Sequence, residues 1–257
     1  MARDVLRSAL RPFYRDQRTI NIALGQGYFP PREKDISELA EIEEQSGRAN
    51  RETMKFRNES VIYLRRPSSV LQEHFDLLTR TRRKTSCGVA HGDLNGRNVM
   101  VDAMGAIHVI DFSTLRYGAP LFLDATRLEV ELKFRIVDLA SPGDVDAFCA
   151  IEELLLDSLQ RPDPNHWQAM PLEPRFAMFA QTATAVRTVA AEIAGEVQQP
   201  RPWQEQYLEG LAAQTLRIAL RPDYLTDRQR EAAILSSALL LDQLMTNLRG
   251  SVASTVV

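Results

Sequence analysis

The sequence predicts a mainly α-helical protein of the α+β class that contains one small β-hairpin. Long segments with apolar residues at helical spacing fill the second half of the chain. Two short runs rich in β-branched residues, 98–102 and 107–110, flank a turn at Gly105 and are typical of a hairpin. The hairpin is the main β signal, and the helices are expected to pack around it.

The expected helices follow from apolar spacing and from breaks at proline-rich segments. In chain order they are 4–14, 36–44, 70–80, 144–159, 174–197, 203–220 and 226–248. Asp144 or Asp146 is expected to cap the fourth helix, whose inward-facing residues are expected to be Phe148, Ile151, Leu154 and Leu155. Thr226 with Gln229 is expected to cap the last helix. A short strand is expected at 60–64, a break at 161–165, and a frayed tail from Gly250.

Composition bounds the class of protein. The 257 residues are 44% hydrophobic, enough for a sizeable core. The formal net charge of -3 gives no electrostatic case for nucleic-acid binding. No segment has the unbroken apolar length of a membrane span, and the charged N-terminus does not resemble a signal peptide. Cys87 and Cys149 form no disulfide framework, are expected to be packing residues, and indicate a reducing, cytoplasmic location.

The most specific segment is His91-Gly92-Asp93-Leu94-Asn95-Gly96-Arg97-Asn98, followed after the hairpin by Asp111-Phe112-Ser113. An Asp in a tight loop can orient and deprotonate a hydroxyl, and an Asn five positions later can reach Mg²⁺. A second Asp at the end of the next strand can join that metal to nucleotide phosphates. The hairpin is expected to bring Asp93, Asn98 and Asp111 together. The alternative is that they are ordinary turn and cap residues.

This motif order resembles the catalytic and metal loops of the aminoglycoside phosphotransferase and choline kinase-like family, relatives of the protein kinases. The segment Gly118–Glu129, in which an Asp begins a helix after a Gly/Pro link, is also similar to that family. The run Arg127–Phe134 more closely resembles a bacterial subgroup described as ternary-complex-associated, predicted phosphotransferase domains.

The resemblance implies a kinase that moves a phosphoryl group from ATP or GTP to a hydroxyl of a small molecule. It implies that Asp93 is the catalytic base and that Asn98 and Asp111 hold Mg²⁺ and, through it, the nucleotide. Support of the loop backbone is the implied role of His91, Gly92 and Asp124. Two departures from the family are Asn95, where many members have His, and Ser113, which replaces a Gly.

A complete kinase also has an N-terminal lobe with a Gly-rich loop and a strand Lys. Before His91 the sequence has one G-x-G, Gly25-Gln26-Gly27, and the Pro30-Pro31 that soon follows cannot continue a strand. Lys34 and Lys55 lie in charged surroundings that do not resemble the strand Lys. The N-terminal lobe is therefore expected to be absent.

The resemblance then implies a single kinase-like C-terminal lobe over 1–257. Its expected parts are a linker and first helices (1–86), the catalytic loop, metal hairpin and next helix (87–137), a helical remainder (138–248) and a tail (249–257). The alternatives left open are a fragment, a site completed by a protein partner, and a catalytically incomplete binding or regulatory subunit. A helical scaffold with a coincidental motif is the weakest alternative.

Two charged runs have open roles. Arg80, Arg82, Arg83 and Lys84 form either a solvated loop or helix end, or a surface for a nucleotide, an acidic substrate or a partner. The pairs Glu129–Lys133 and Glu131–Arg135 are expected to stabilise their helix by about 0.3 kcal/mol each.

Overall fold

The computed structural model describes residues 7, 17–23, 28, 31–57, 61–160, 167, 170–197, 199–221 and 223–253. Three expectations lie outside these residues: the helix over 4–14, of which residue 7 alone is described, the Gly25-Gln26-Gly27 segment, and the break at 161–165.

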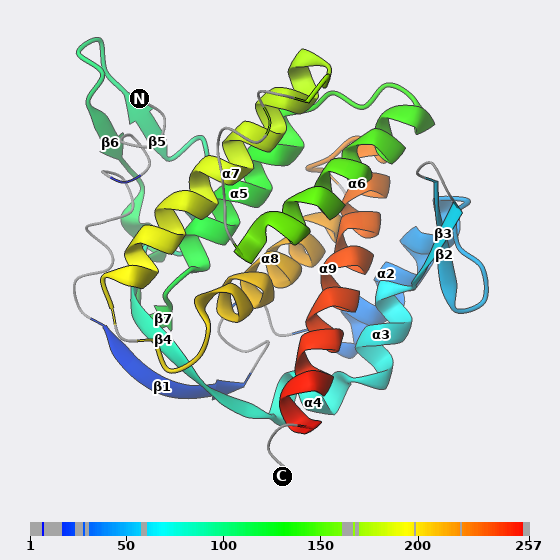
Figure 1. The fold of residues 1–257 in the computed structure, drawn as a ribbon, viewed down its shortest axis with the longest axis horizontal. Coiled ribbons are helices and arrows are strands. Elements are labelled where there is room, and N and C mark those ends of the chain that lie inside the picture. The colour runs from blue at the N-terminus through cyan, green and yellow to red at the C-terminus, as the bar shows by residue number, and fades with distance from the viewer. Residues whose placement is uncertain are drawn as a thin grey trace.

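The described residues form short strands followed by long helices (Figure 1). The order is β1 (Arg18–Ala23), α2 (Glu33–Gln45), β2 (Thr53–Arg57), β3 (Val61–Arg65), α3 (Pro67–Glu73), α4 (Phe75–Arg80), β4 (Arg82–Ala90), β5 (Val99–Val101), β6 (Ile107–Val109), η2 (Phe112–Thr114), β7 (Arg116–Pro120), α5 (Leu123–Ile136), α6 (Pro142–Asp157), η3 (Ser158–Gln160), α7 (Pro174–Gly195), α8 (Trp203–Ala219) and α9 (Asp227–Ala253). The mainly α class with small antiparallel sheets is confirmed.

Helices α5 to α9 form the body of the molecule, with α5 packed against both α7 and α8, and α9 against α6 and α8 (Figure 1). Aromatic rings fill the space between α5, α6 and α7. Phe148 stacks on Phe179 with ring centroids 4.6 Å apart, and Phe134 lies 5.3 Å from Phe148. At Gly210 a Cβ would come within 2.8 Å of Thr126, so glycine allows α8 to approach the start of α5.

The three-stranded sheet β1-β4-β7 lies at one end of this body, with β4 in the middle. Both pairings are antiparallel, and Ala90 at the end of β4 faces Arg116 at the start of β7. Because β4 runs directly into His91 and β7 begins soon after Asp111, the sheet fixes both ends of the segment that holds the candidate site.

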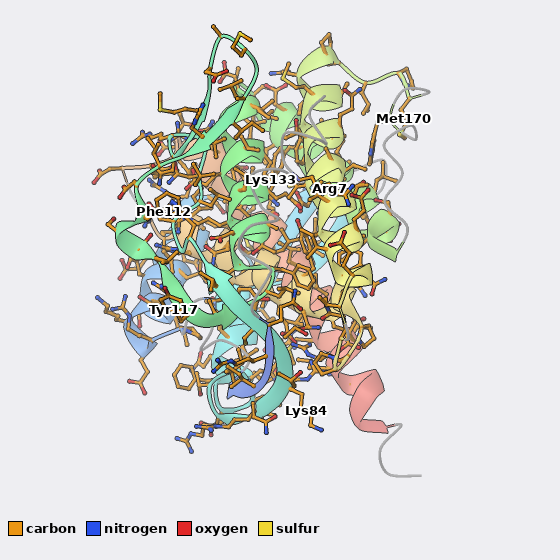
Figure 2. All side chains as sticks on the ribbon, turned by 90° about the vertical axis from the view of Figure 1, so that its left-hand side faces the viewer. Arg7, Lys84, Phe112, Tyr117, Lys133 and Met170 are labelled. Atoms are coloured by element: carbon orange, nitrogen blue, oxygen red, sulfur yellow. The ribbon has the colours of Figure 1, made fainter. Side chains whose placement is uncertain are left out.

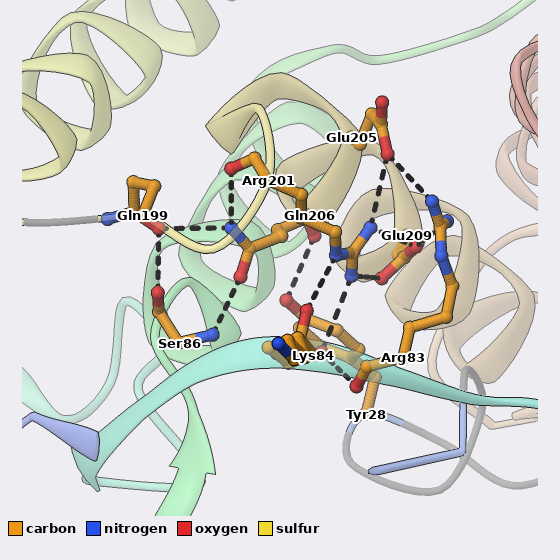
Figure 3. Close-up of polar contacts among 10 residues, drawn as sticks. Tyr28, Arg83, Lys84, Ser86, Gln199, Arg201, Glu205, Gln206 and Glu209 are labelled. Atoms are coloured by element: carbon orange, nitrogen blue, oxygen red, sulfur yellow. Dashed lines mark hydrogen bonds and ion pairs between the residues drawn. The ribbon is translucent and has the colours of Figure 1, made fainter. Parts of the chain in front are cut away.

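Strand β4 is held to α8 by polar contacts (Figure 3). Arg83 binds Glu205 at 2.9 Å and Glu209 at 3.0 Å, and the main-chain N–H of Ser86 donates to Gln206 at 2.9 Å. The prediction that this basic run is a solvated loop or helix end is therefore wrong for Arg83, which lies in a strand and has two carboxylate partners. These contacts fix the strand that leads to the candidate site.

The first 90 residues contain more strand than expected. The strand expected at 60–64 is present as β3, but its partner β2 was not expected, and neither were β1 and β4. Lys55 lies in β2, opposite Tyr63 of β3. Figure 1 shows the β2–β3 hairpin at the opposite edge of the molecule from β5–β6, so Lys55 does not lie beside the candidate site.

Several helix boundaries differ from expectation. The helix over 70–80 is divided into α3 and α4 at His74. The N-cap of α6 is Ser141, whose hydroxyl accepts from the main-chain N–H of Asp144 at 3.2 Å. The carboxylate of Asp144 in turn accepts from the main-chain N–H of Ser141 at 2.8 Å. Leu154, expected to face inward, is 37% exposed. Helix α9 continues to Ala253, through the start of the expected tail.

Other expectations are confirmed. Thr226 and Gln229 exchange main-chain to side-chain hydrogen bonds of 3.3 and 3.0 Å at the start of α9, the predicted cap. Cys87 and Cys149 are both buried, and burial raises the pKa of Cys87 to about 11. Among the described helices, none combines the length and apolar character needed to cross a membrane.

All the charged residues of α5 except Arg135 are buried. Glu129 binds Arg187 of α7 at 2.7 Å, and Lys133 binds Glu152 of α6 at 2.9 Å. The expected Glu129–Lys133 pair is therefore wrong, because each residue has a partner on another helix. The other expected pair, Glu131–Arg135, is present at 3.5 Å.

Candidate active site

The backbone of the loop that begins at His91 is held from below by Asp124. This buried residue lies in the first turn of α5, and its two carboxylate oxygens accept from the main-chain N–H groups of His91 at 2.6 Å and Gly92 at 2.9 Å. Burial raises the pKa of Asp124, and the two N–H donors offset part of that effect. The carboxylate therefore sets the position of the peptide groups immediately before Asp93.

Glycine is required at position 92. Its φ is +80°, and a Cβ there would lie 2.4 Å from the carbonyl oxygen of Thr114. The loop thus passes close to the segment that follows Asp111, and the hydroxyl of Thr114 also donates to the carbonyl of His91 at 2.8 Å. The two parts of the motif are packed against each other at this point.

Asn98 joins the loop to the hairpin. Its side-chain Nδ2 donates to the carbonyl of Asp93 at 2.9 Å, and its own carbonyl accepts from the N–H of Ile110 at 3.0 Å. The ring of His91 contacts the carbonyl of Ile110 at 2.8 Å. Asp93, Asn98 and the residue before Asp111 therefore belong to one network, and the Asn98 amide nitrogen is used within it.

Asp111 is exposed and has left-handed backbone geometry, with φ 60° and ψ 65°. It is the one non-glycine residue with positive φ in the described part of the chain. The hydroxyl of Ser113 donates to its carboxylate at 2.6 Å and lowers the pKa of Asp111. The turn thus presents an ionised carboxylate to solvent at the end of β6.

The carboxylate of Asp93 forms an ion pair with Arg127, a buried residue of α5. The ion pair uses Oδ1; the other oxygen lies 3.4 Å from the amide nitrogen of Asn95. Because the Asp93 side chain is 32% exposed, it stays accessible to a ligand.

Sequence reasoning missed the basic residues that lie near Asp93. These are Arg127, Arg217 at the end of α8, and Arg221 just beyond it. The available signal was the two arginines at and just after the end of the expected helix, Arg217 and Arg221, which lie close together without an acidic residue between them.

The loop and the turn offer oxygen donors of the kind that Mg²⁺ prefers. The described residues contain no group of three His, Cys, Asp or Glu side chains that could form a metal cage. Mg²⁺ is commonly bound by one or two carboxylates with waters and substrate phosphates. The ionised carboxylate of Asp111 and the amide oxygen of Asn98 are the protein groups suited to that arrangement.

Fold and site together define a mainly α protein whose acidic loop, hairpin and acidic turn meet over the start of one helix. The family model described as ternary complex associated domain 9 matches residues 6–218, and the chain belongs to this family. The ternary-complex-associated part of the narrower resemblance is therefore confirmed, whereas the relationship to kinases stays a prediction. No curated protein and no solved structure was found to match the chain.

Proposed function

We propose that this protein is a phosphotransferase that moves the γ-phosphoryl group of ATP or GTP to a hydroxyl of a small molecule. The observation that carries the proposal is the network in which Asp124 holds the loop backbone while Asn98 links Asp93 to the residue before Asp111. Phosphoryl transfer depends mainly on positioning and on charge stabilisation, so few protein groups are needed.

In the proposed reaction, the acceptor hydroxyl donates to the accessible oxygen of Asp93. Its oxygen forms a bond to the γ-phosphorus while the bond from that phosphorus to the β–γ bridging oxygen breaks. The proton passes to Asp93, and the nucleoside diphosphate leaves. Asn98 and Asp111 would hold Mg²⁺, which when bound supplies positive charge to the phosphate oxygens.

Replacing Asp93 by Asn is expected to lower turnover by about 10²–10⁴-fold, because the amide cannot accept the proton. Nucleotide binding should remain, since Asp93 is not one of the proposed metal ligands. The measurement is transfer of labelled γ-phosphate to a panel of hydroxyl compounds, with Asp102→Asn in the exposed hairpin turn as the matched control. Full turnover by Asp93→Asn would show that another group is the base.

A second candidate function is a binding subunit whose site is completed by a protein partner. Large apolar side chains are exposed along the hairpin, the turn after it and the start of β7: Met100, Val101, Met104, Ile110, Phe112, Leu115 and Tyr117. Phe112 is 49% exposed and Tyr117 81%, and Figure 2 shows both on the same side of the molecule. Such surfaces often bind proteins, and the family description names a ternary complex.

The two candidates differ in what the isolated chain does. A complete enzyme transfers phosphate by itself, whereas the binding subunit gains activity only when a partner covers the apolar side chains around Asp111. Replacing Met104 and Tyr117, which are 93% and 81% exposed, by Ser would then abolish capture of that partner and leave the fold intact.

A further inference from the structure

A narrow hollow opens beside Asp93, between α5 and α8. It is small, with a volume of about 10 Å³, and it opens to solvent. Its polar lining is Arg127 and Glu131 from α5, Gln214 and Arg217 from α8, and Arg221 just beyond α8. Asp93 does not line the hollow, but Arg127 connects the two, because its guanidinium is paired with the carboxylate of Asp93.

The lining carries excess positive charge. Glu131 is already bound by Arg135 at 3.5 Å and by the hydroxyl of Tyr224. Arg127 is paired with Asp93, whereas Arg217 and Arg221 form no ion pair with any carboxylate of the described chain. Two half-buried guanidinium groups therefore face the hollow without a balancing anion.

Two buried donors in the lining also lack partners. Nε of Arg127 and Nε2 of Gln214 have no hydrogen-bond partner within the described residues, although both side chains are more than nine-tenths buried. Buried polar groups are normally paired, so unpaired donors beside a hollow indicate a missing acceptor. Burial, together with the neighbouring guanidinium groups, lowers the pKa of Arg217 to about 10, in keeping with a missing anion.

We infer that the arginines at the mouth of this hollow bind the phosphate group of a phosphate monoester, and that this monoester is the hydroxyl-bearing acceptor. The inference rests on the proposed function and names its substrate class. Two guanidinium groups without a carboxylate match the charge of a phosphate monoester, which is close to -2 at neutral pH. Arginine also suits phosphate because its planar fork donates two parallel hydrogen bonds.

The geometry indicates that this phosphate group belongs to the acceptor and not to the nucleotide. Arg127 contacts the carboxylate of Asp93, which receives the acceptor hydroxyl, whereas Asn98 contacts the main-chain carbonyl of the same residue. A phosphate held by Arg127, Arg217 and Arg221 therefore anchors one end of the acceptor and leaves its hydroxyl next to Asp93. Anchoring a distant group in this way is an effective means of positioning a reacting one.

The test is calorimetric titration of the full chain with glycerol 3-phosphate, inorganic phosphate and succinate, in EDTA and without nucleotide. Glycerol 3-phosphate and phosphate are expected to bind the wild type. They should bind Arg217→Gln about 10-fold or more weakly, because a charged hydrogen-bonding group is lost. Arg82→Gln, which replaces an exposed arginine at the start of β4, should bind as the wild type does. Without ligand, Arg217→Gln should melt no lower than the wild type, because it removes an unpaired charge.

Absence of phosphate binding by the wild type, or equal binding by Arg217→Gln, would overturn the inference. So would succinate binding as tight as that of glycerol 3-phosphate, which would assign the hollow to carboxylates. Loss of Mg·ATP binding in Arg217→Gln would assign the arginines to the nucleotide instead. The proposed function fails separately, if the wild type binds glycerol 3-phosphate through Arg217 but does not bind Mg·ATP.

Discussion

Replacing Asp124 by Ala is expected to destabilise the fold and to release the loop that carries Asp93. The substitution leaves the main-chain N–H groups of His91 and Gly92 buried without an acceptor. An unsatisfied buried donor costs about 1–3 kcal/mol, and two are created here. Denaturant unfolding measures the loss of stability, and amide hydrogen exchange at His91 and Gly92 reports whether the loop itself opens.

Asp102→Ala is the matched control for this change. The carboxylate of Asp102 also accepts from two main-chain N–H groups, those of Met104 and Ala106, both at 2.9 Å. That turn is exposed, so water replaces the lost acceptor and we expect a cost below about 1 kcal/mol. Equal costs for the two variants would mean that Asp124 does not hold the loop through its buried position.

Replacing Arg187 by Met is expected to cost about 3–5 kcal/mol, because it leaves a buried charge without its partner. Arg187 lies at the centre of the helical body, where its guanidinium binds Glu129 of α5 and the carbonyl of Leu155 in α6. After the substitution, Glu129 retains the hydroxyl of Tyr207 at 2.7 Å. The measurement is the free energy of unfolding in urea.

Two further variants isolate the buried charge as the cause. Arg80→Met removes an exposed arginine paired with Asp76 and should cost less than about 1 kcal/mol. The double variant Arg187→Met, Glu129→Leu removes both charges and should recover much of the lost stability. If the double variant were less stable than Arg187→Met alone, packing of the arginine rather than charge would explain the loss.

Local pattern predicted most of the helices and the β5–β6 hairpin, because apolar spacing and turn residues act over short distances. It did not predict strand β4, whose first residues are Arg82, Arg83 and Lys84. Their charge suggests solvent, yet Arg83 is neutralised by Glu205 and Glu209, more than a hundred residues later. The buried pairs of α5 were missed for the same reason, since Glu129 and Lys133 each have a distant partner.

The candidate site also has a part that local sequence predicts and a part that depends on distant contacts. The motif spacing was enough to predict that Asp93, Asn98 and Asp111 lie near one another, because a hairpin of known length joins them. Nothing in that spacing indicates Arg127, which reaches Asp93 from α5, or Arg217, which lies near it at the end of α8. The nucleotide chemistry and the role of Mg²⁺ stay predictions.

Titration calorimetry of the full chain with ATP in the presence of Mg²⁺, alongside Asp111→Ala and Asp102→Ala, tests the central claim most directly. The proposed site predicts binding that requires Mg²⁺, is weakened about 10-fold or more by Asp111→Ala, and is unchanged by Asp102→Ala. The result that would contradict it is a folded wild-type chain that does not bind Mg·ATP, or an Asp111→Ala variant that binds it as tightly as the wild type.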